Sequence, residues 1–343
     1  MYPLDQGMWG PTVRISHLRD ELSRLADLDL VAGYRGTRRK QLARYAFGGR
    51  LRGLNGIYVE SSTFLPAETD LAFLGLGKAL RIPILTYIRD AYQLFDDYGS
   101  PESLKQRLSA RAFRPMIAAL RAVSTHMAFP SAGLAKAVLG DARGATDAIL
   151  LPPGAPAPVS VARDSRANRL LFVGDARLPA QGGDRLVQAV EQARAGGADI
   201  ELDVVSRPGQ EPEGPHLDWL HLHRASGDAI HALLPQTLAT VIPRPRNAYN
   251  DLAVPIKLFD YLSYGRPLVI TDCTEQARIV RQADAGIVVG DTVEAMSAGF
   301  LHLLQTDASQ LDAWSAHAAE AARRSAWSTR AEQIVEIITG GEA

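Results

Sequence analysis

Short apolar runs alternate with amphipathic segments along most of this chain. The runs that end in polar or glycine residues are predicted to be strands, at residues 28–34, 55–61, 82–88, 122–129, 168–175, 200–206, 238–243, 268–270 and 286–290. Between them apolar residues recur at helical spacing; one such face carries Val13, Leu18, Leu22 and Leu25. Strands that alternate with helices are typical of an α/β protein with mostly parallel sheets.

The pattern is interrupted near the middle of the chain. After an apolar run at 148–151, four prolines fall between Pro152 and Pro158, a composition typical of a linker between domains. A second series of strands and helices follows. Because 343 residues are too many for one typical core, two α/β domains are predicted.

The composition is that of a soluble globular enzyme, with 46% apolar and 22% charged residues. No apolar run approaches the roughly 20 residues that span a bilayer, and the first residues lack the pattern of a signal peptide. Cys273 is the single cysteine, which excludes an intramolecular disulfide and a cysteine metal cluster. We therefore expect the protein in the reducing cytoplasm.

The net charge of −1 conceals an asymmetry between +6 over residues 1–150 and −7 over residues 151–343. The basic excess is concentrated at residues 34–53, which hold seven Lys or Arg and no acid. A solvated helix face is the simplest interpretation. The alternative is a surface, over residues 35–52, for anionic lipid headgroups at the inner face of the membrane or for a phosphorylated acceptor. Nucleic acid is not expected, because few aromatics are interleaved and the whole chain is near neutral.

The segment "VPIKLFDYLSYGRPLVIT", residues 254–271, holds the strongest candidate chemistry. Pro255 is compatible with the first turn of a helix. Lys257 and Asp260 are three positions apart, so they share one face of that helix and lie near its N-terminal end. A helix N-terminus with a cation suits a phosphate, and a buried carboxylate can accept hydrogen bonds from ribose hydroxyls. The plain alternative is a surface ion pair, which contributes little to stability.

Other candidates follow predicted strands, where ligands bind in open α/β sheets. Arg244 and Arg246 could neutralise a diphosphate, although a basic surface loop is equally compatible. Thr274 and Glu275 follow the next strand and could approach a sugar. Glycines would let the backbone come close to a ligand, or could be plain turn residues; these are Gly7, Gly10 and Gly174. Neither a metalloprotease HExxH motif nor a clustered set of histidines is present, so no metal is expected.

Several runs, in this order and spacing, resemble the retaining glycosyltransferases of family 4. They are "QGMWGPTVRISHLRDELSRL", "IPILTYIRDAY", "FPSAGLAKAVLG", "LLFVGDARLPAQGGDRLVQAV", the 254–271 segment and "AWSTRAEQIVEII". The resemblance implies the glycosyltransferase B fold, in which two Rossmann-like doubly wound domains face a cleft. It also implies an N-terminal acceptor-side domain at 1–155 plus 326–343 and a donor-binding domain at 165–325. Only Met1 to Leu4 precede the first glycine-rich turn, so the first strand is expected to be short or missing.

The implied activity is hexosyl transfer from a UDP- or GDP-sugar to a glycan or lipid-linked acceptor, with retention of configuration and without a cofactor or metal. Asp90, after a predicted strand, becomes a candidate for orienting the acceptor. The chain departs from the family pattern where Leu252 replaces an acid, with Asp251 adjacent. It departs again where Asp175 and Gln181 replace an Arg and Lys pair, with Arg177 nearby. A degenerate non-catalytic subunit and a nucleotide-sugar epimerase of the same fold therefore stay open as alternatives.

Overall fold

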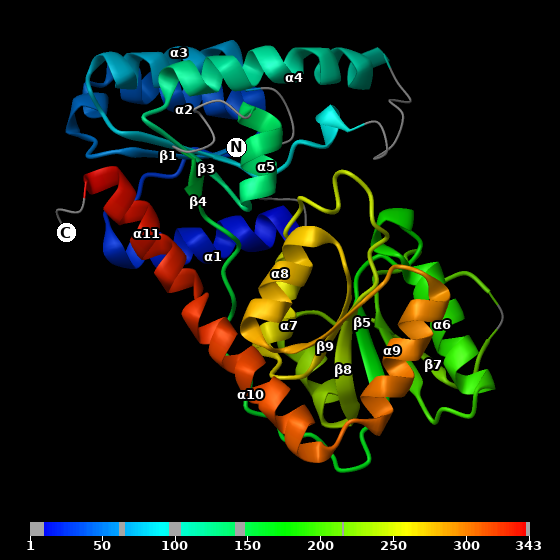
Figure 1. Cartoon of the computed structure of the whole chain (residues 1–343). Helices are drawn as coiled ribbons and strands as arrows, with labels where there is room; N and C mark the ends of the chain where they lie inside the picture. The colour runs from blue at the N-terminus through cyan, green and yellow to red at the C-terminus, as the bar shows by residue number, and fades with distance from the viewer. Residues whose placement is uncertain (1–9, 62–65, 96–103, 141–147, 215, 341–343) are drawn as a thin grey trace. The chain divides into compact units, whose positions relative to one another are not determined.

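The computed structural model describes residues 10–61, 66–95, 104–140, 148–214 and 216–340. The chain forms two compact units (Figure 1). Unit 1 contains residues 1–154 and 327–343, and unit 2 contains residues 155–326. The chain leaves unit 1 at Gly154 and returns to it at Trp327. Ala155 and Ala326, the residues that follow and precede these two points, form an isolated parallel bridge.

Unit 1 is built around a parallel sheet. Its described strands are β1 (Ile57–Ser61), β2 (Ile84–Ile88), β3 (His126–Phe129) and β4 (Ile149–Leu150), in the order β1-β2-β3-β4. Its helices are α1 (Gly10–Leu25), α2 (Arg35–Phe47), α3 (Glu68–Ala79), α4 (Leu104–Val123), α5 (Ala132–Leu139) and α11 (Trp327–Thr339). Short 3-10 helices lie at Arg50–Gly53 (η1) and Tyr92–Leu94 (η2).

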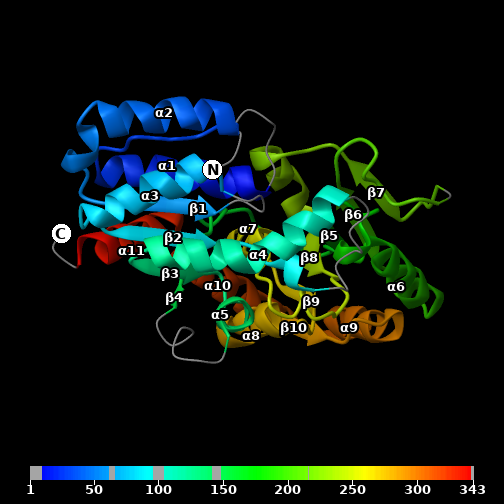
Figure 2. The ribbon, with the colours of Figure 1, turned by 90° about the horizontal axis from the view of Figure 1, so that it is seen from above.

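Helices cover both faces of this sheet (Figures 1 and 2). On one face, Leu74 of α3 and Phe113 of α4 pack against alternate strand residues such as Ile84. On the other face, Leu18 of α1 and Ile334 of α11 form a second core with the intervening strand residues. Because side chains of successive strand residues point to opposite faces, a strand in a sheet covered on both sides is buried along its whole length. All five residues of β2 are buried.

The strand predicted at residues 28–34 is wrong. This segment has no strand or helix in the structure, and Leu28 and Leu30 are 38% and 45% exposed. Its alternating leucines resemble a strand locally, but no neighbouring strand is present among the described residues to accept its backbone hydrogen bonds. The predicted short or missing first strand, at Met1 to Leu4, lies outside the described residues.

Unit 2 contains a larger parallel sheet, in the order β10-β9-β8-β5-β6-β7. Its strands are β5 (Arg169–Val173), β6 (Glu201–Val205), β7 (Leu220–His223), β8 (Thr237–Ile242), β9 (Leu268–Thr271) and β10 (Gly286–Val289). The helices are α6 (Gly183–Ala195), α7 (Ile256–Ser263), α8 (Thr274–Ala283), α9 (Val293–Gln305) and α10 (Ala308–Arg324). Short 3-10 helices lie at Pro179–Gln181 (η4) and Gly227–Gln236 (η5).

The strand order of unit 2 reverses direction between β5 and β8. From β5 the chain builds outward through β6 and β7, and from β8 it builds the other way through β9 and β10. The two starting strands are hydrogen-bonded neighbours. In open α/β sheets, the loops that leave the carboxyl ends of two such strands diverge and leave a crevice where ligands bind. A ligand is therefore expected next to the residues that follow Val173 in β5 and Ile242 in β8.

Each face of this sheet has its own core. Helices α6 and α9 cover one face through residues such as Val190 and Phe300. Helix α7 lies on the other face, where Leu258, Phe259 and Leu262 are buried. The Val173 N–H also donates to the Tyr261 hydroxyl at 2.7 Å, which fixes α7 against the carboxyl end of β5.

Candidate nucleotide-binding site

Helix α7 presents Lys257 and Asp260 away from its buried face. Pro255 is the N-cap of this helix, one position before the first turn where the sequence predicted it. Leu258, Phe259 and Leu262 are buried on the opposite side of the helix. Lys257 and Asp260 are therefore half-buried at the edge of the core. Both lie next to the carboxyl end of β5.

The Lys257 ammonium is largely shielded from solvent. Its Nζ donates to Gln181 Oε1 at 2.7 Å and lies 4.6 Å from the centre of the Phe172 ring. Burial and the nearby Arg244 cation lower the pKa of Lys257 to about 7, although Asp260 and Asp175 act in the opposite direction. A lysine that is partly neutral at pH 7 gains charge when an anion arrives.

Asp260 is the acidic partner in this environment. Burial raises its pKa to about 7, which Lys257 partly opposes. No ion pair joins Lys257 and Asp260 among the ion pairs of the described residues, since Lys257 is directed to Gln181. The pair is therefore not the ordinary surface ion pair considered from the sequence. It is two groups with perturbed pKa values in one place, a combination that is common at functional sites.

Gly174 makes room for this arrangement. It follows β5 with φ of +150°, and its N–H donates to the Val205 carbonyl at 2.9 Å. A Cβ atom at this position would lie 2.4 Å from Gln181 Oε1 and 2.8 Å from Lys257 Nζ. Glycine suits the backbone conformation, and any added side chain would have to displace the ends of Gln181 and Lys257.

Arg244 is the second cation next to α7. It follows β8, is 8% exposed and donates to the Asn250 side-chain oxygen. Asn250 is itself held by a bond from its Nδ2 to the Pro245 carbonyl at 2.8 Å. Gly174 and Arg244 thus follow the two strands that flank the reversal of strand order, β5 and β8.

Arg246 has a different environment. Its guanidinium forms two bonds with the Asp251 carboxylate, at 2.9 and 3.1 Å, and one with Asp272 at 3.5 Å. These carboxylates raise the pKa of Arg246 above its ordinary value. Asp251 also accepts from the Thr274 N–H at 3.3 Å, and its carbonyl accepts from the Glu275 N–H at 3.0 Å. The N-terminus of α8 is therefore already occupied by an acid of the protein.

The remaining predicted residues lie elsewhere. Arg177 is exposed and pairs with Glu213, so it is not brought to Lys257. Asp90 follows β2 in unit 1, where Arg89 Nε donates to its carboxylate. Gly10 is the first residue of α1. Gly7 lies outside the described residues.

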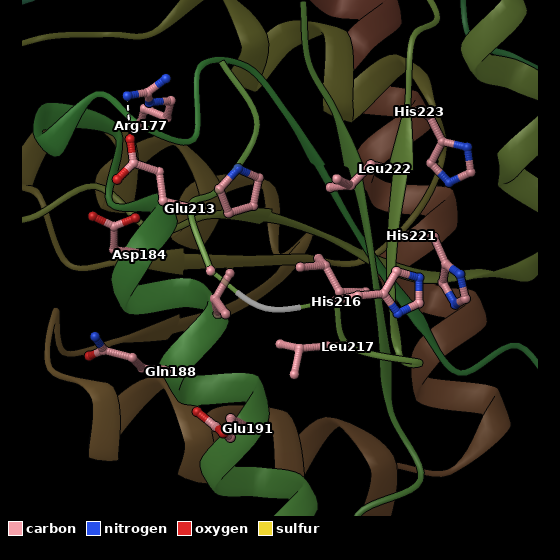
Figure 3. Close-up of a pocket in the computed structure, with 14 residues that line it drawn as sticks. Arg177, Asp184, Gln188, Glu191, Glu213, His216, Leu217, His221, Leu222 and His223 are labelled. Carbon is pink, nitrogen blue, oxygen red and sulfur yellow. Dashed lines mark ion pairs between the residues drawn. The ribbon is translucent and has the colours of Figure 1, made fainter. Parts of the chain in front are cut away.

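An open pocket of about 1130 Å³ lies in unit 2 between α6 and β7 (Figure 3). Arg177, Asp184 and Glu191 line one side, and Leu217 and Leu222 lie across from them. Neither Lys257, Asp260 nor Arg244 lines this pocket. It is thus a second concave region of unit 2, separate from the predicted residues except Arg177.

The sequence did not predict the contact of Gln181 with Lys257 or that of Asp272 with Arg246. Gln181 ends η4, directly before the Gly182–Gly183 start of α6, and its bond to Lys257 joins residues 76 positions apart. Asp272 follows β9, and a strand-end position was the available signal for it. Together, Lys257, Asp260, Arg244 and the Gly174 turn combine cationic and acidic groups at the carboxyl edge of the sheet, which suits an anionic ligand that also carries hydroxyl groups.

Residues 167–306 match the family model described as glycosyl transferases group 1. The matched region lies within unit 2 and contains all the residues of the candidate site. No curated protein sequence matches the chain.

Several solved structures have the same fold. Sucrose-phosphate synthase from Thermosynechococcus elongatus is 13% identical with a TM-score of 0.64, over 96% of this chain and 92% of that one. A glycosyltransferase from Rickettsia africae ESF-5 is 10% identical with a TM-score of 0.63, over 94% and 87% of the two chains. An alpha,alpha-trehalose-phosphate synthase (UDP-forming) from Burkholderia vietnamiensis is 13% identical with a TM-score of 0.59, over 96% and 83%.

These similarities establish the fold of the chain. It consists of two Rossmann-like α/β domains of the glycosyltransferase B type, as the sequence predicted. At 10 to 13% sequence identity they do not show which donor or acceptor this protein uses.

Proposed function

We propose that this protein is a glycosyltransferase that takes its sugar from a nucleotide-sugar donor bound at the Lys257–Asp260 site. The observation that carries the proposal is the position of Lys257 and Asp260, with perturbed pKa values, at the reversal of strand order in unit 2. The match of this unit to glycosyl transferases group 1 supports it.

The donor is proposed to bind through its diphosphate and its ribose. Lys257 and Arg244 supply positive charge next to the Gly174 turn, where the absence of a side chain lets phosphate oxygens approach the backbone. Asp260 accepts hydrogen bonds from ribose hydroxyls. Thr274 and Glu275, held at the start of α8 by Asp251, are assigned to the sugar end of the donor.

Arg246 is assigned to the outer phosphate. Its two carboxylate partners neutralise it in the structure, so a phosphate must compete with Asp251 and Asp272. An exposed pair of this kind is weak in water, so exchange of the Asp251 carboxylate for a phosphate costs little.

The chemistry that follows is transfer with retention of configuration. The bond between the anomeric carbon and the diphosphate oxygen breaks, and the acceptor hydroxyl bonds to the same carbon while its proton passes to the departing diphosphate. Lys257 and Arg244 stabilise the charge that develops on that oxygen. Asp90 in unit 1 is assigned to orienting an acceptor, either a glycan or a lipid-linked sugar.

Thermal unfolding in the presence of UDP or GDP tests this proposal. At a ligand concentration 100 times the Kd, binding stabilises the folded state by about 2.7 kcal/mol, and we expect this with one of the two nucleotides. The nucleotide should no longer raise the unfolding temperature of Asp260→Ala. It should still raise that of Asp228→Ala, because Asp228 is an exposed acid of the same unit. No shift with either nucleotide at millimolar concentration contradicts the proposal.

A non-catalytic nucleotide-binding subunit is the second candidate. It is favoured by Leu252, Asp175 and Gln181, which depart from the family pattern of acidic and basic residues. Slow hydrolysis of the matching nucleotide-sugar, measured by release of free nucleotide, separates the two. Binding without hydrolysis or transfer favours the non-catalytic subunit.

A further inference from the structure

Of three neighbouring helices of unit 1, the two outer ones, α2 and α4, are strongly basic. Helix α3 packs against both α2 and α4 (Figures 1 and 2). Within α2, α3 and α4 the sequence places eleven Lys or Arg and only two acids, Glu68 and Asp70. The basic character predicted for residues 35–52 therefore extends to α4, which contributes five of these cations and no acid.

Of the two acids, only Glu68 lies at the surface, and it offsets a single cation. Asp70 is 2% exposed and forms an ion pair with the buried Arg38 at 2.7 Å, while also accepting from the Ala67 N–H. Glu68 pairs with Arg35. The other cations of these helices are exposed wherever their side chains are described, and they form no ion pair with the described residues. They are Arg39, Lys40, Arg44, Lys78, Arg107, Arg111, Arg114 and Arg121, of which Lys78 donates to the Ala122 carbonyl.

Large apolar side chains are exposed among these cations. Phe47, at the end of α2, is 91% exposed, and Leu108 of α4 is 55% exposed. Leu76 of α3 and Leu80, the C-cap of this helix, are 43% and 37% exposed. An exposed leucine alone is ordinary, but a phenylalanine with almost its whole side chain in water costs free energy that burial would recover.

The cations and Phe47 lie on one side of α2. Lys40, Arg44 and Phe47 are spaced i, i+4 and i+7, so they share a face. Arg38 and Leu42 are buried on the opposite face. A helix with cations and an exposed aromatic on its outer face fits the interface of an anionic bilayer, where the charges meet headgroups and the ring enters the acyl boundary.

We propose that the exposed surface of α2, α3 and α4 binds the surface of a membrane that contains anionic lipid. A merely solvated face does not account for Phe47, and the exposed aliphatic side chains Leu76, Leu80 and Leu108 suit an acyl boundary better than they suit bases. None of the helices that the structure describes is long and apolar enough to span a bilayer, and binding at the surface needs no such helix. This inference does not depend on the donor site in unit 2.

Flotation with lipid vesicles tests it. The full chain is mixed with phosphatidylcholine vesicles, or with vesicles containing 30% phosphatidylglycerol, at about 0.1 M and 0.5 M salt. We expect binding to the anionic vesicles at the lower salt, little binding to the neutral ones, and a large loss at the higher salt, because the screening length falls well below 10 Å. Equal binding to both vesicles, or no binding to either, overturns the proposal.

Two variants and a matched control locate the surface. Each Lys or Arg near an anionic surface changes partitioning roughly fivefold, so Lys40→Gln with Arg44→Gln should weaken binding about 25-fold. Phe47→Ser should weaken it about tenfold at either salt. Arg166→Gln with Arg281→Gln removes the same charge from exposed sites of unit 2 and should bind as the unchanged protein does.

A control pair that weakens binding as much as the Lys40 and Arg44 pair overturns the assignment to α2. Salt-sensitive binding to duplex DNA or RNA, without binding to anionic vesicles, overturns the lipid assignment. Circular dichroism of each variant shows whether it is folded. The salt response of the unchanged protein tests the proposal without any substitution.

Discussion

Gln181 and Lys257 meet at 2.7 Å although 76 positions separate them in the sequence. The side-chain oxygen of Gln181 accepts from the ammonium, which also lies over the Phe172 ring. Gln181 is neutral, so it holds the ammonium in place without cancelling its charge. The positive charge of Lys257 is therefore available to an incoming anion.

Loss of the Gln181 acceptor should weaken nucleotide binding. A hydrogen bond to a charged group contributes roughly 1.5–3 kcal/mol, so Gln181→Leu should lower the pKa of Lys257 below about 7 and raise the Kd for the nucleotide at least tenfold at pH 7.5. Isothermal titration calorimetry measures this. Gln188→Leu, an exposed position of α6, is the control and should leave the Kd unchanged. Equal affinity of Gln181→Leu and the unchanged protein contradicts this role.

Nucleotide binding should take up a proton. With a pKa of about 7, Lys257 is mostly neutral at pH 8. Asp260 and Asp175 favour the charged form of Lys257, and Arg244 disfavours it. A diphosphate adds negative charge that favours the charged form, so the complex binds the proton that the free protein lacks. Calorimetry in two buffers of different ionisation enthalpy measures the uptake. Lys257→Arg should bind without uptake, because arginine stays charged; a proton still taken up by that variant would point to another group.

The combined contribution of Lys257 and Asp260 to the free energy of unfolding should be smallest near pH 7. Asp260 has a raised pKa, so between pH 4 and 7 the folded state holds more protons than the unfolded one, and stability falls as pH rises. Lys257 has a lowered pKa, so between pH 7 and 10 the unfolded state holds more protons and stability rises with pH. Denaturant midpoints from pH 5 to 9 should show a dip that Lys257→Met with Asp260→Asn removes. An unchanged dip would mean that other groups cause it.

Replacement of Gly174 separates the space at the site from backbone strain. Gly174→Ala places a Cβ atom 2.4 Å from Gln181 Oε1 and 2.8 Å from Lys257 Nζ, so it should displace both groups and abolish measurable nucleotide binding. Gly197→Ala is the control, because Gly197 also has positive φ, +90°, but nothing lies within 4 Å of the added atom. Both variants should lose about 1–2 kcal/mol of stability. Weakened binding in Gly197→Ala as well would remove the steric explanation.

The ion pair between Arg38 and Asp70 should be important for the stability of unit 1. Both side chains are buried, 2.7 Å apart, and loss of one partner leaves a buried charge, which typically costs about 3–5 kcal/mol. Arg38→Met should therefore lower the denaturant midpoint strongly. Arg35→Met removes the exposed pair with Glu68 and should change the midpoint little. Similar midpoints for the two variants would contradict this difference.

The sequence predicted the fold well because the signals are local. Alternation of apolar strands with amphipathic helices, and proline and glycine at the linker, identified both α/β units. The helix with Lys257 and Asp260 was likewise visible from spacing alone. The strand at 28–34 failed because a strand needs a neighbour, and spacing does not reveal whether one is present.

Long-range side-chain contacts were not accessible to this reasoning. Arg14 reads as a polar position of an amphipathic helix, yet it is 1% exposed, stacks 3.9 Å from the Tyr87 ring and pairs with Glu60 at 2.8 Å. Arg38 likewise reads as part of a surface cluster and is buried. In both cases the partner comes from a distant segment, and tertiary structure decides whether the charge is solvated or paired.

A crystal structure of the chain with UDP or GDP tests the central claim most directly. The account predicts the diphosphate within about 3 Å of Lys257 Nζ, next to the Gly174 turn, and the ribose hydroxyls at hydrogen-bond distance from the Asp260 carboxylate. A nucleotide bound instead in the pocket between α6 and β7 (Figure 3), with Lys257 still bonded to Gln181 alone, would contradict it.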